Sequence, residues 1–162
     1  MQNQHDMMPD QMAPEWITEQ WLNSDPHTLA SLRGRVIVAG AFQMLCPGCV
    51  SELIPQLRQV HALFKSSDVM VLGLHTVFEH HGAMEAVSLK AFLHENRIIF
   101  PVAIDRPQIP DAHIPATMEL YGMRGTPTMM LIDTKGRLRR CIFGHVDDMQ
   151  LGAEIMGLMK ET

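Results

Sequence analysis

The sequence contains few cysteines, no excess of positive charge and no long hydrophobic run, and each absence excludes a class of protein. Three cysteines in 162 residues are too few for a small domain held together by disulfides. The formal net charge of -5 offers no basic surface to a phosphate backbone, so we expect no nucleic-acid partner. No segment approaches the roughly 18 apolar residues of a membrane-spanning helix. The first residues also lack the basic and apolar stretches of a leader peptide, and we therefore expect a cytoplasmic protein with no membrane partner.

What the chain does contain is the composition of one folded domain. Apolar residues make up 46% and charged residues 19% of the sequence, which is ordinary for a globular protein. Its length also suits a single domain. The first residues are rich in Met, Gln and Asp and show no periodic apolar pattern. We therefore expect a flexible arm over 1–13 and one folded domain over 14–162.

Apolar periodicity predicts an alternation of strands and helices. The expected strands cover 16–22, 36–42, 69–74, 98–104, 128–132 and 138–143, and the expected helices cover 47–64, 85–96, 117–121 and 148–159. Pro101 cannot donate to a strand ladder, so the strand 98–104 is expected to be irregular or at a sheet edge. The last two strands flank a turn that contains Gly136 and should form a hairpin. This order predicts an α/β fold, with a mixed central sheet and helices on both faces.

The sequence Cys46-Pro47-Gly48-Cys49 follows a continuously apolar predicted strand and opens a long predicted helix. Backbone N–H groups and the positive dipole end at a helix start stabilise an anion, which favours a thiolate at Cys46. Cys49 lies one turn further in, where its sulfur can close a small ring with that of Cys46. The pattern predicts that Cys46 attacks a disulfide and that Cys49 resolves the mixed disulfide. A zinc site is the alternative, but it needs about four ligands, and no second CxxC or HxxxH pattern is present.

Two segments around these residues resemble thioredoxin-like proteins of TlpA type, a branch of the redoxin group. The segments read LRGRVIVAGAFQMLCPGCV and YGMRGTPTMMLIDTKGR, and the resemblance extends from about Ala13 to the C-terminus. It implies a thioredoxin-like fold and a thiol–disulfide oxidoreductase that acts on protein or small-molecule disulfides. It also implies a thiol donor that reduces the protein again, and no cofactor beyond the Cys46–Cys49 disulfide.

The resemblance also assigns residues that meet the substrate. In this family a cis proline, preceded by a small or hydroxyl residue, lies beside the cysteines, and the matching pair here is Thr126-Pro127. Thr126 is then expected to pair with the backbone of a bound partner, and Pro127 to keep metals and other nucleophiles from the sulfurs. Leu45 stands where many relatives have Trp. Together with Pro47, Leu45 is expected to give the partner-binding surface an aliphatic border.

Two further departures from the family concern the helix and the proton acceptor. Pro55 follows Cys49 by six residues where relatives usually have five, so the kink or register of the first helix is expected to differ. Gly40 stands where thioredoxin carries a buried carboxylate, so a proton acceptor for Cys49 must come from elsewhere. The loop after the next strand offers Glu79, the nearest counterpart of a glutamate in TlpA-type relatives, and His75. We assign the catalytic role to Glu79, with a solvated loop position as the alternative for each residue.

Two other functions fit part of the pattern. A thiol peroxidase of redoxin type shares the fold, but it carries proline and threonine at set distances before its cysteine, where this chain has Ala39 and Gln43. A copper-binding chaperone would use Cys46, Cys49 and a distant histidine such as His145. That arrangement usually has a wider cysteine spacing, and disulfide exchange remains the favoured function.

Overall fold

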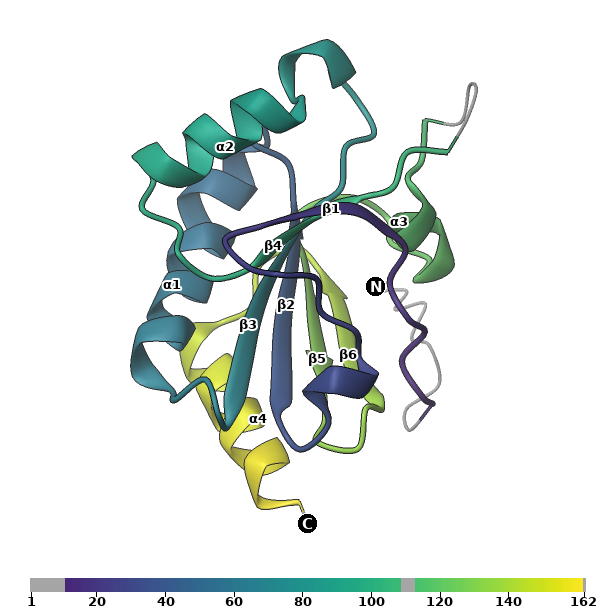
Figure 1. Cartoon of the computed structure of the whole chain (residues 1–162). Coiled ribbons are helices and arrows are strands. Elements are labelled where there is room, and N and C mark those ends of the chain that lie inside the picture. Colours follow the sequence, from purple (N-terminus) through teal and green to yellow (C-terminus); the bar gives the residue numbers. More distant parts are fainter. Residues whose placement is uncertain (1–10, 109–112, 162) are drawn as a thin grey trace, which may run out of the picture.

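The computed structural model describes residues 11–108 and 113–161. Its six strands form one mixed sheet in the order β1-β4-β3-β2-β5-β6 (Figure 1). The strands are β1 (Thr18–Leu22), β2 (Val36–Phe42), β3 (Val69–His75), β4 (Val102–Asp105), β5 (Thr128–Ile132) and β6 (Leu138–Phe143). The helical segments are η1 (Ala30–Leu32), η2 (Cys49–Leu53), α1 (Ile54–Leu63), η3 (His81–Ala83), α2 (Ala86–Glu95), α3 (Ala116–Leu120) and α4 (Asp148–Lys160). Within the described ranges, no helix has the length and apolar character needed to span a membrane.

The sheet is parallel at its centre and antiparallel towards both edges. β3 pairs in parallel with β2 and β4, whereas β1 runs antiparallel to β4 and β5 runs antiparallel to β2 and β6. All seven residues of the central strand β2 are buried, which explains its continuously apolar sequence. The predicted α/β fold with a mixed sheet is confirmed, and so is the hairpin formed by β5 and β6.

The prediction of an edge or irregular strand over 98–104 is wrong. β4 begins at Val102, directly after Pro101, and pairs with β1 on one side and β3 on the other. Pro101 lies just outside the strand, where its missing N–H costs no ladder bond. Its carbonyl accepts a hydrogen bond from the N–H of Gly73 at 2.9 Å. The sheet edge on this side is β1 instead.

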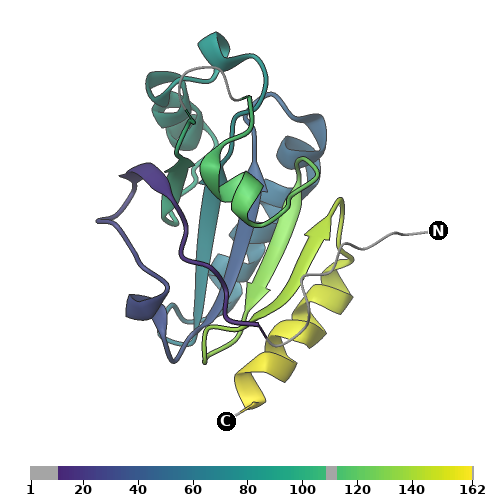
Figure 2. The same ribbon diagram turned by 90° about the vertical axis from the view of Figure 1, so that its right-hand side faces the viewer.

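Helices cover both faces of the sheet, as the sequence predicts. Leu57 of α1, Leu89 of α2 and Ile155 of α4 belong to the apolar core on one face. Met118 of α3 and Leu32 of η1 belong to the core on the other face. Figure 2 shows the two layers, with the N-terminal segment and α4 on opposite sides of the strands.

The end of the predicted flexible arm is part of the folded domain. Met12 forms an antiparallel bridge with Arg137, and the N–H of Ala13 donates to the carbonyl of Gly136 at 2.9 Å. These contacts hold the chain against the β5–β6 hairpin. The rest of the arm, residues 1–10, lies outside the described residues.

The predicted helix 47–64 is divided into two parts, because the segment that begins at Cys49 has π geometry. In η2, which begins at Cys49, the N–H of Ile54 donates to the carbonyl of Cys49, five residues back. α1 then continues with Pro55, which has no N–H to donate, in its first turn. A π turn contains more residues than an α turn. It therefore accommodates the extra residue between Cys49 and Pro55, and the expected difference in register from relatives stays a prediction.

Candidate active site

Cys46 lies where β2 passes into the helical segment. β2 ends at Phe42, and the N–H of Cys46 donates to the carbonyl of Gln43 at 3.2 Å, which closes a tight turn. The carbonyl of Cys46 then accepts the N–H of Val50 at 3.1 Å, so Cys46 stands at the first helical turn. Because β2 is buried along its whole length, it fixes this turn at the carboxyl end of the parallel strands.

The two cysteines differ in their exposure and in their contacts. Cys46 is half-buried and Cys49 is 0% exposed, and both are free thiols. The N–H of Cys49 donates to Sγ of Cys46 at 3.3 Å. A hydrogen bond from an amide stabilises a thiolate more than a thiol. The Cys46 thiol also lies 3.6 Å from the carbonyl oxygen of Thr126, to which it donates.

Burial determines the protonation of Cys49. It raises the pKa of the Cys49 thiol to about 12, and the neighbouring Cys46 side chain acts in the same direction. Hydrogen bonds with Gln43 and Thr126 oppose this shift without cancelling it. At neutral pH Cys49 is therefore a protonated thiol, and it needs a base before it can act as a nucleophile.

The loop before β5 lies directly against the cysteine turn. The Thr126-Pro127 peptide bond is cis, as the resemblance to the TlpA-type proteins predicts. A Cβ placed on Gly48 would lie 3.5 Å from Cδ of Pro127, so the proline ring packs beside the backbone between the two cysteines. The carbonyl of Pro127 accepts the N–H of Gly144 at 2.9 Å, which fixes the loop to the end of β6.

The side chains next to Cys46 form an apolar, exposed border. Leu45 is 57% exposed and Val50 is 40% exposed. Pro47, between the two cysteines, is also exposed. The structure thus places Leu45 and Pro47 where a partner that approaches the sulfur would meet them, and their binding role stays a prediction.

Phe143 is a further apolar residue at this site that sequence reasoning missed. It is 49% exposed, and a Cβ placed on Gly125 would lie only 3.0 Å from its ring. The guanidinium carbon of Arg124 lies 5.7 Å from the ring centroid. Phe143 is the register partner of Thr128 in the β5–β6 hairpin. The sequence did contain a signal for this residue. Counting the strand pairs outward from the hairpin turn pairs Phe143 with Thr128, and so places its ring near the preceding residues Gly125 and Thr126.

Glu79 leaves the sheet beside the cysteine turn but is not in contact with it. The register of the parallel strands pairs Phe42 with His75, and Cys46 and Glu79 each lie four residues beyond these partners. The N–H of Phe78 donates to Oε1 of Gln43 at 3.2 Å, which holds the two loops together. Glu79 is exposed, and no hydrogen bond joins it to either cysteine among the contacts of the described residues. Its catalytic role stays a prediction.

His75, the second candidate for proton acceptor, is poorly suited to the role. Its ring lies 5.1 Å from that of Phe42 and is 1% exposed, and within the described part of the chain its Nε2 has no hydrogen-bond partner. Burial lowers the pKa of His75 to about 4. A base this weak cannot readily take a proton from a thiol as weakly acidic as Cys49.

Gly40 leaves no room for the carboxylate that thioredoxin carries at this position. A Cβ on Gly40 would lie 2.6 Å from Cδ1 of Leu57 and 3.1 Å from both terminal methyl carbons of Leu53. These leucines fill the space between β2 and the helix that follows the cysteines. The expectation that the proton acceptor lies elsewhere agrees with this packing.

His145, the histidine considered for copper, is engaged with a carboxylate. Its Nδ1 lies 3.4 Å from Oε2 of Glu52, one turn beyond Cys49. Nε2 of Gln56 donates to the carbonyl of Val146 at 2.8 Å and joins the same two segments. In the ranges that the structure describes, no three His, Cys, Asp or Glu side chains are grouped as a metal site would require.

The whole chain can be compared with known proteins. A profile of the Redoxin family matches residues 8–150. Among solved structures, the chain is similar to a thioredoxin-like superfamily protein at 56% identity and a TM-score of 0.90, covering 93% of this chain and 97% of that chain. It is also similar to a thiol-disulfide isomerase from Corynebacterium glutamicum, at 43% identity and a TM-score of 0.91, covering 94% of this chain and 98% of that chain.

Curated relatives are more distant. Thiol-disulfide oxidoreductase ResA of Geobacillus thermodenitrificans is 22% identical over 132 residues, which are 82% of this chain and 67% of that protein. Protein DipZ of Mycobacterium bovis is 31% identical over 136 residues, which are 78% of this chain but 17% of DipZ. The chain therefore corresponds to a small part of DipZ and to most of ResA.

Proposed function

Since this chain belongs to the Redoxin family and is a thioredoxin-like protein of TlpA type, we propose that it reduces protein disulfides through Cys46 and Cys49. Its homologues establish thiol–disulfide oxidoreductase function in general. The proposal adds the two residues, the order of the steps and the direction of electron flow. It further holds that the protein works in the cytoplasm, with no cofactor other than the cysteine pair.

The proposed reaction consists of two displacements at sulfur. The Cys46 thiolate attacks one sulfur of the substrate disulfide, so a bond forms between Cys46 and the substrate while the substrate S–S bond breaks. The departing thiolate takes a proton from solvent. Cys49 then loses its proton to a base and attacks the Cys46 sulfur, which forms the Cys46–Cys49 disulfide and releases the second substrate thiol. Two electrons have passed to the substrate, and an external thiol donor reduces the pair again.

One observation carries this assignment, the asymmetry between the two sulfurs. Cys46 is accessible, and an amide N–H at 3.3 Å stabilises its anion. Cys49 is 0% exposed, and burial raises its pKa to about 12. A substrate can therefore reach Cys46 first, and the protonated Cys49 does not compete until the mixed disulfide has formed beside it.

The surroundings of Cys46 support a polypeptide substrate. The Thr126 carbonyl, 3.6 Å from the reactive sulfur, belongs to backbone that an extended chain can pair with. Leu45 and Phe143 add exposed apolar surface around the same position. A substrate with an extended, apolar segment next to its cysteine would bury this surface.

Reduction of insulin by dithiothreitol tests the proposal. The protein should accelerate the reaction, and Cys46→Ser should abolish the acceleration. Cys49→Ser should instead trap substrate on Cys46 as a mixed disulfide, visible by mass spectrometry and lost on reduction. Cys141→Ser is the matched control, because Cys141 lies half-buried in β6, outside the proposed site, and its loss should leave the rate unchanged. Full activity in Cys46→Ser would refute the assignment.

A further inference from the structure

A groove away from the cysteines has the size of a small-molecule site. It lies between the C-terminal end of α2 and the turn that follows β1, and its volume is about 590 Å³. Small-molecule sites typically measure roughly 300–1,000 Å³ and combine apolar walls with a few polar groups. Leu22, Leu93 and Ile99 supply apolar lining, and none of the residues of the cysteine site takes part.

The walls of the groove are held together by one side chain. Asn23, at the end of β1, has a left-handed backbone with φ of 66°. Its side-chain amide donates to the carbonyl of Ile98 at 2.9 Å and to that of Phe100 at 3.0 Å. These two bonds join the turn after β1 to the turn after α2. The groove is therefore preformed, and a ligand would not have to order it.

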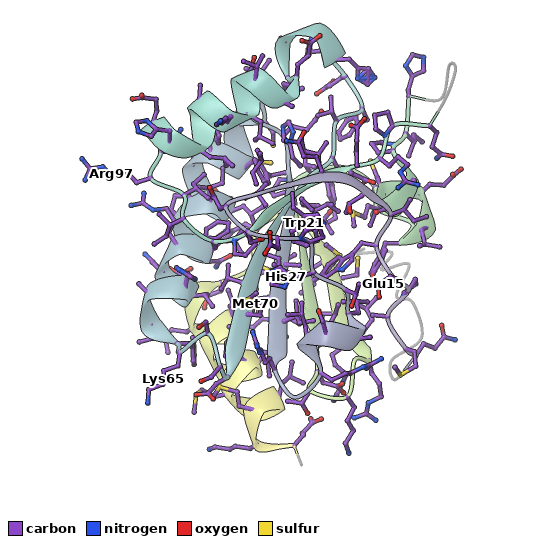
Figure 3. The ribbon with its side chains drawn as sticks, viewed as in Figure 1. Glu15, Trp21, His27, Lys65, Met70 and Arg97 are labelled. Carbon is purple, nitrogen blue, oxygen red and sulfur yellow. The ribbon has the colours of Figure 1, made fainter. Side chains whose placement is uncertain are left out.

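Positive charge lines one side of the groove. Lys90 and His94 lie four residues apart on α2, Arg97 follows the end of the helix, and the lining contains no acidic side chain. His94 faces the neighbouring Glu95, with 3.3 Å between Nδ1 and Oε1. Across the described residues, no ion pair involves Lys90 or Arg97. Figure 3 shows Arg97 extending outward from the end of α2.

The backbone at Arg97 is unusual for the residue that occupies it. Arg97 has a left-handed φ of 52° directly after α2, a position where helices commonly carry glycine. The N–H of Ile98 donates to the carbonyl of Leu93 at 2.9 Å, which turns the chain and buries Ile98. Ile99 is left 72% exposed at the groove. The turn thus places the guanidinium of Arg97 near the exposed side chain of Ile99. Glycine would adopt the backbone of Arg97 with less strain.

We propose that this groove binds an organic anion of small-molecule size, with an aliphatic body and a terminal carboxylate. Lys90 and Arg97 hold the carboxylate, and Leu22, Leu93 and Ile99 cover the aliphatic body. Burial of the aliphatic carbons supplies affinity, and the two cations select the charged end. The proposal goes beyond disulfide exchange and depends on none of the residues used there.

Titration of the ¹⁵N-labelled full chain with octanoate, below its micelle concentration, tests the proposal. Backbone amide shifts should be confined to the end of β1, to α2 and to the turn after α2. Octan-1-ol, which has the same chain length without the charge, should bind more weakly. The double variant Lys90→Gln/Arg97→Asn should weaken octanoate binding about tenfold, as expected for two exposed charge contacts. Asn at 97 tolerates the left-handed backbone, so the fold should be kept.

A second double variant controls for net charge. Lys65→Gln/Lys160→Gln removes two exposed cations outside the groove lining, and Figure 3 shows Lys65 well separated from Arg97. This variant should keep the wild-type affinity for octanoate, and both double variants should keep insulin reductase activity. Shifts outside the groove, equal binding of octanol and octanoate, or equal affinity in the two double variants would each overturn the proposal.

Discussion

Replacing His75 with Phe should make the protein lose less stability in mild acid than wild type does. His75 is 1% exposed, and the hydrogen bonds of the described residues leave its Nε2 without a partner. Burial lowers its pKa from 6.5 to about 4. The unfolded chain therefore takes up a proton on this histidine near pH 6.5, whereas the folded protein does not do so until about pH 4.

The sign and size of the effect follow from this difference. Because the folded state binds fewer protons between the two pKa values, the free energy of unfolding is highest above pH 6.5 and falls as the pH decreases. One pKa unit corresponds to about 1.4 kcal/mol, so the complete loss at His75 amounts to roughly 3 kcal/mol. At pH 5 about 2 kcal/mol of it should already be gone.

Urea unfolding at pH 7 and at pH 5 measures this loss. Wild type should lose about 2 kcal/mol more than His75→Phe between the two pH values. At pH 7 the variant should be at least as stable as wild type, because it removes a buried polar atom without a partner and packs a ring against Phe42. His94→Gln is the control, since the His94 side chain is 85% exposed and His75 is buried.

The outcome that contradicts the argument is an equal loss in wild type and His75→Phe. Carboxylates also titrate in this pH range, but they are shared by the two proteins, so the difference between the losses isolates His75. An equal loss would mean that His75 takes up its proton in the folded state as easily as in the unfolded chain.

Two further predictions concern the helix and the proton acceptor. Deleting the exposed Ser51 should convert the π turn into an α turn and lower the free energy of unfolding by less than about 1 kcal/mol. Deleting Gln59 from the regular helix α1 should instead displace the buried Val60 and lower it by roughly 2–5 kcal/mol. Urea unfolding measures both changes. Glu79→Gln should slow insulin reduction at neutral pH at least about tenfold, because it removes the proposed base for Cys49, while Glu85→Gln, outside this loop, should not. An unchanged rate in Glu79→Gln would place Glu79 among the solvated loop residues.

Local patterns were sufficient for the features that depend on neighbours in sequence. The apolar run from Val36 to Phe42 identified the central strand, and Asp147 directly precedes the predicted last helix. In the structure its carboxylate accepts N–H bonds from Met149 at 2.9 Å and Gln150 at 3.1 Å. These interactions span at most a few residues, so spacing alone reveals them.

Features that depend on distant partners could not be predicted in this way. Pro101 suggested an edge strand, but whether a strand lies at an edge is decided by its partners, and β4 pairs with β1. Phe143 reads as one more apolar strand residue until the hairpin register places it beside Gly125. The groove at α2 likewise depends on Asn23, which bonds a carbonyl 75 residues away in the sequence. Tertiary pairing, rather than local preference, creates these sites.

Gln43 shows how one departure from a related pattern can organise the active site. A thiol peroxidase of redoxin type carries threonine at this position, whose short hydroxyl side chain cannot extend as far as an amide. Gln43 is 1% exposed and serves both loops at once, because its backbone carbonyl accepts the N–H of Cys46 and its side-chain Oε1 accepts the N–H of Phe78. The residue therefore fixes the proposed nucleophile and, through Phe78, the loop that carries Glu79. A side chain too short to reach Phe78 would leave that loop free to move, and the proposed base would lose its fixed position relative to Cys49.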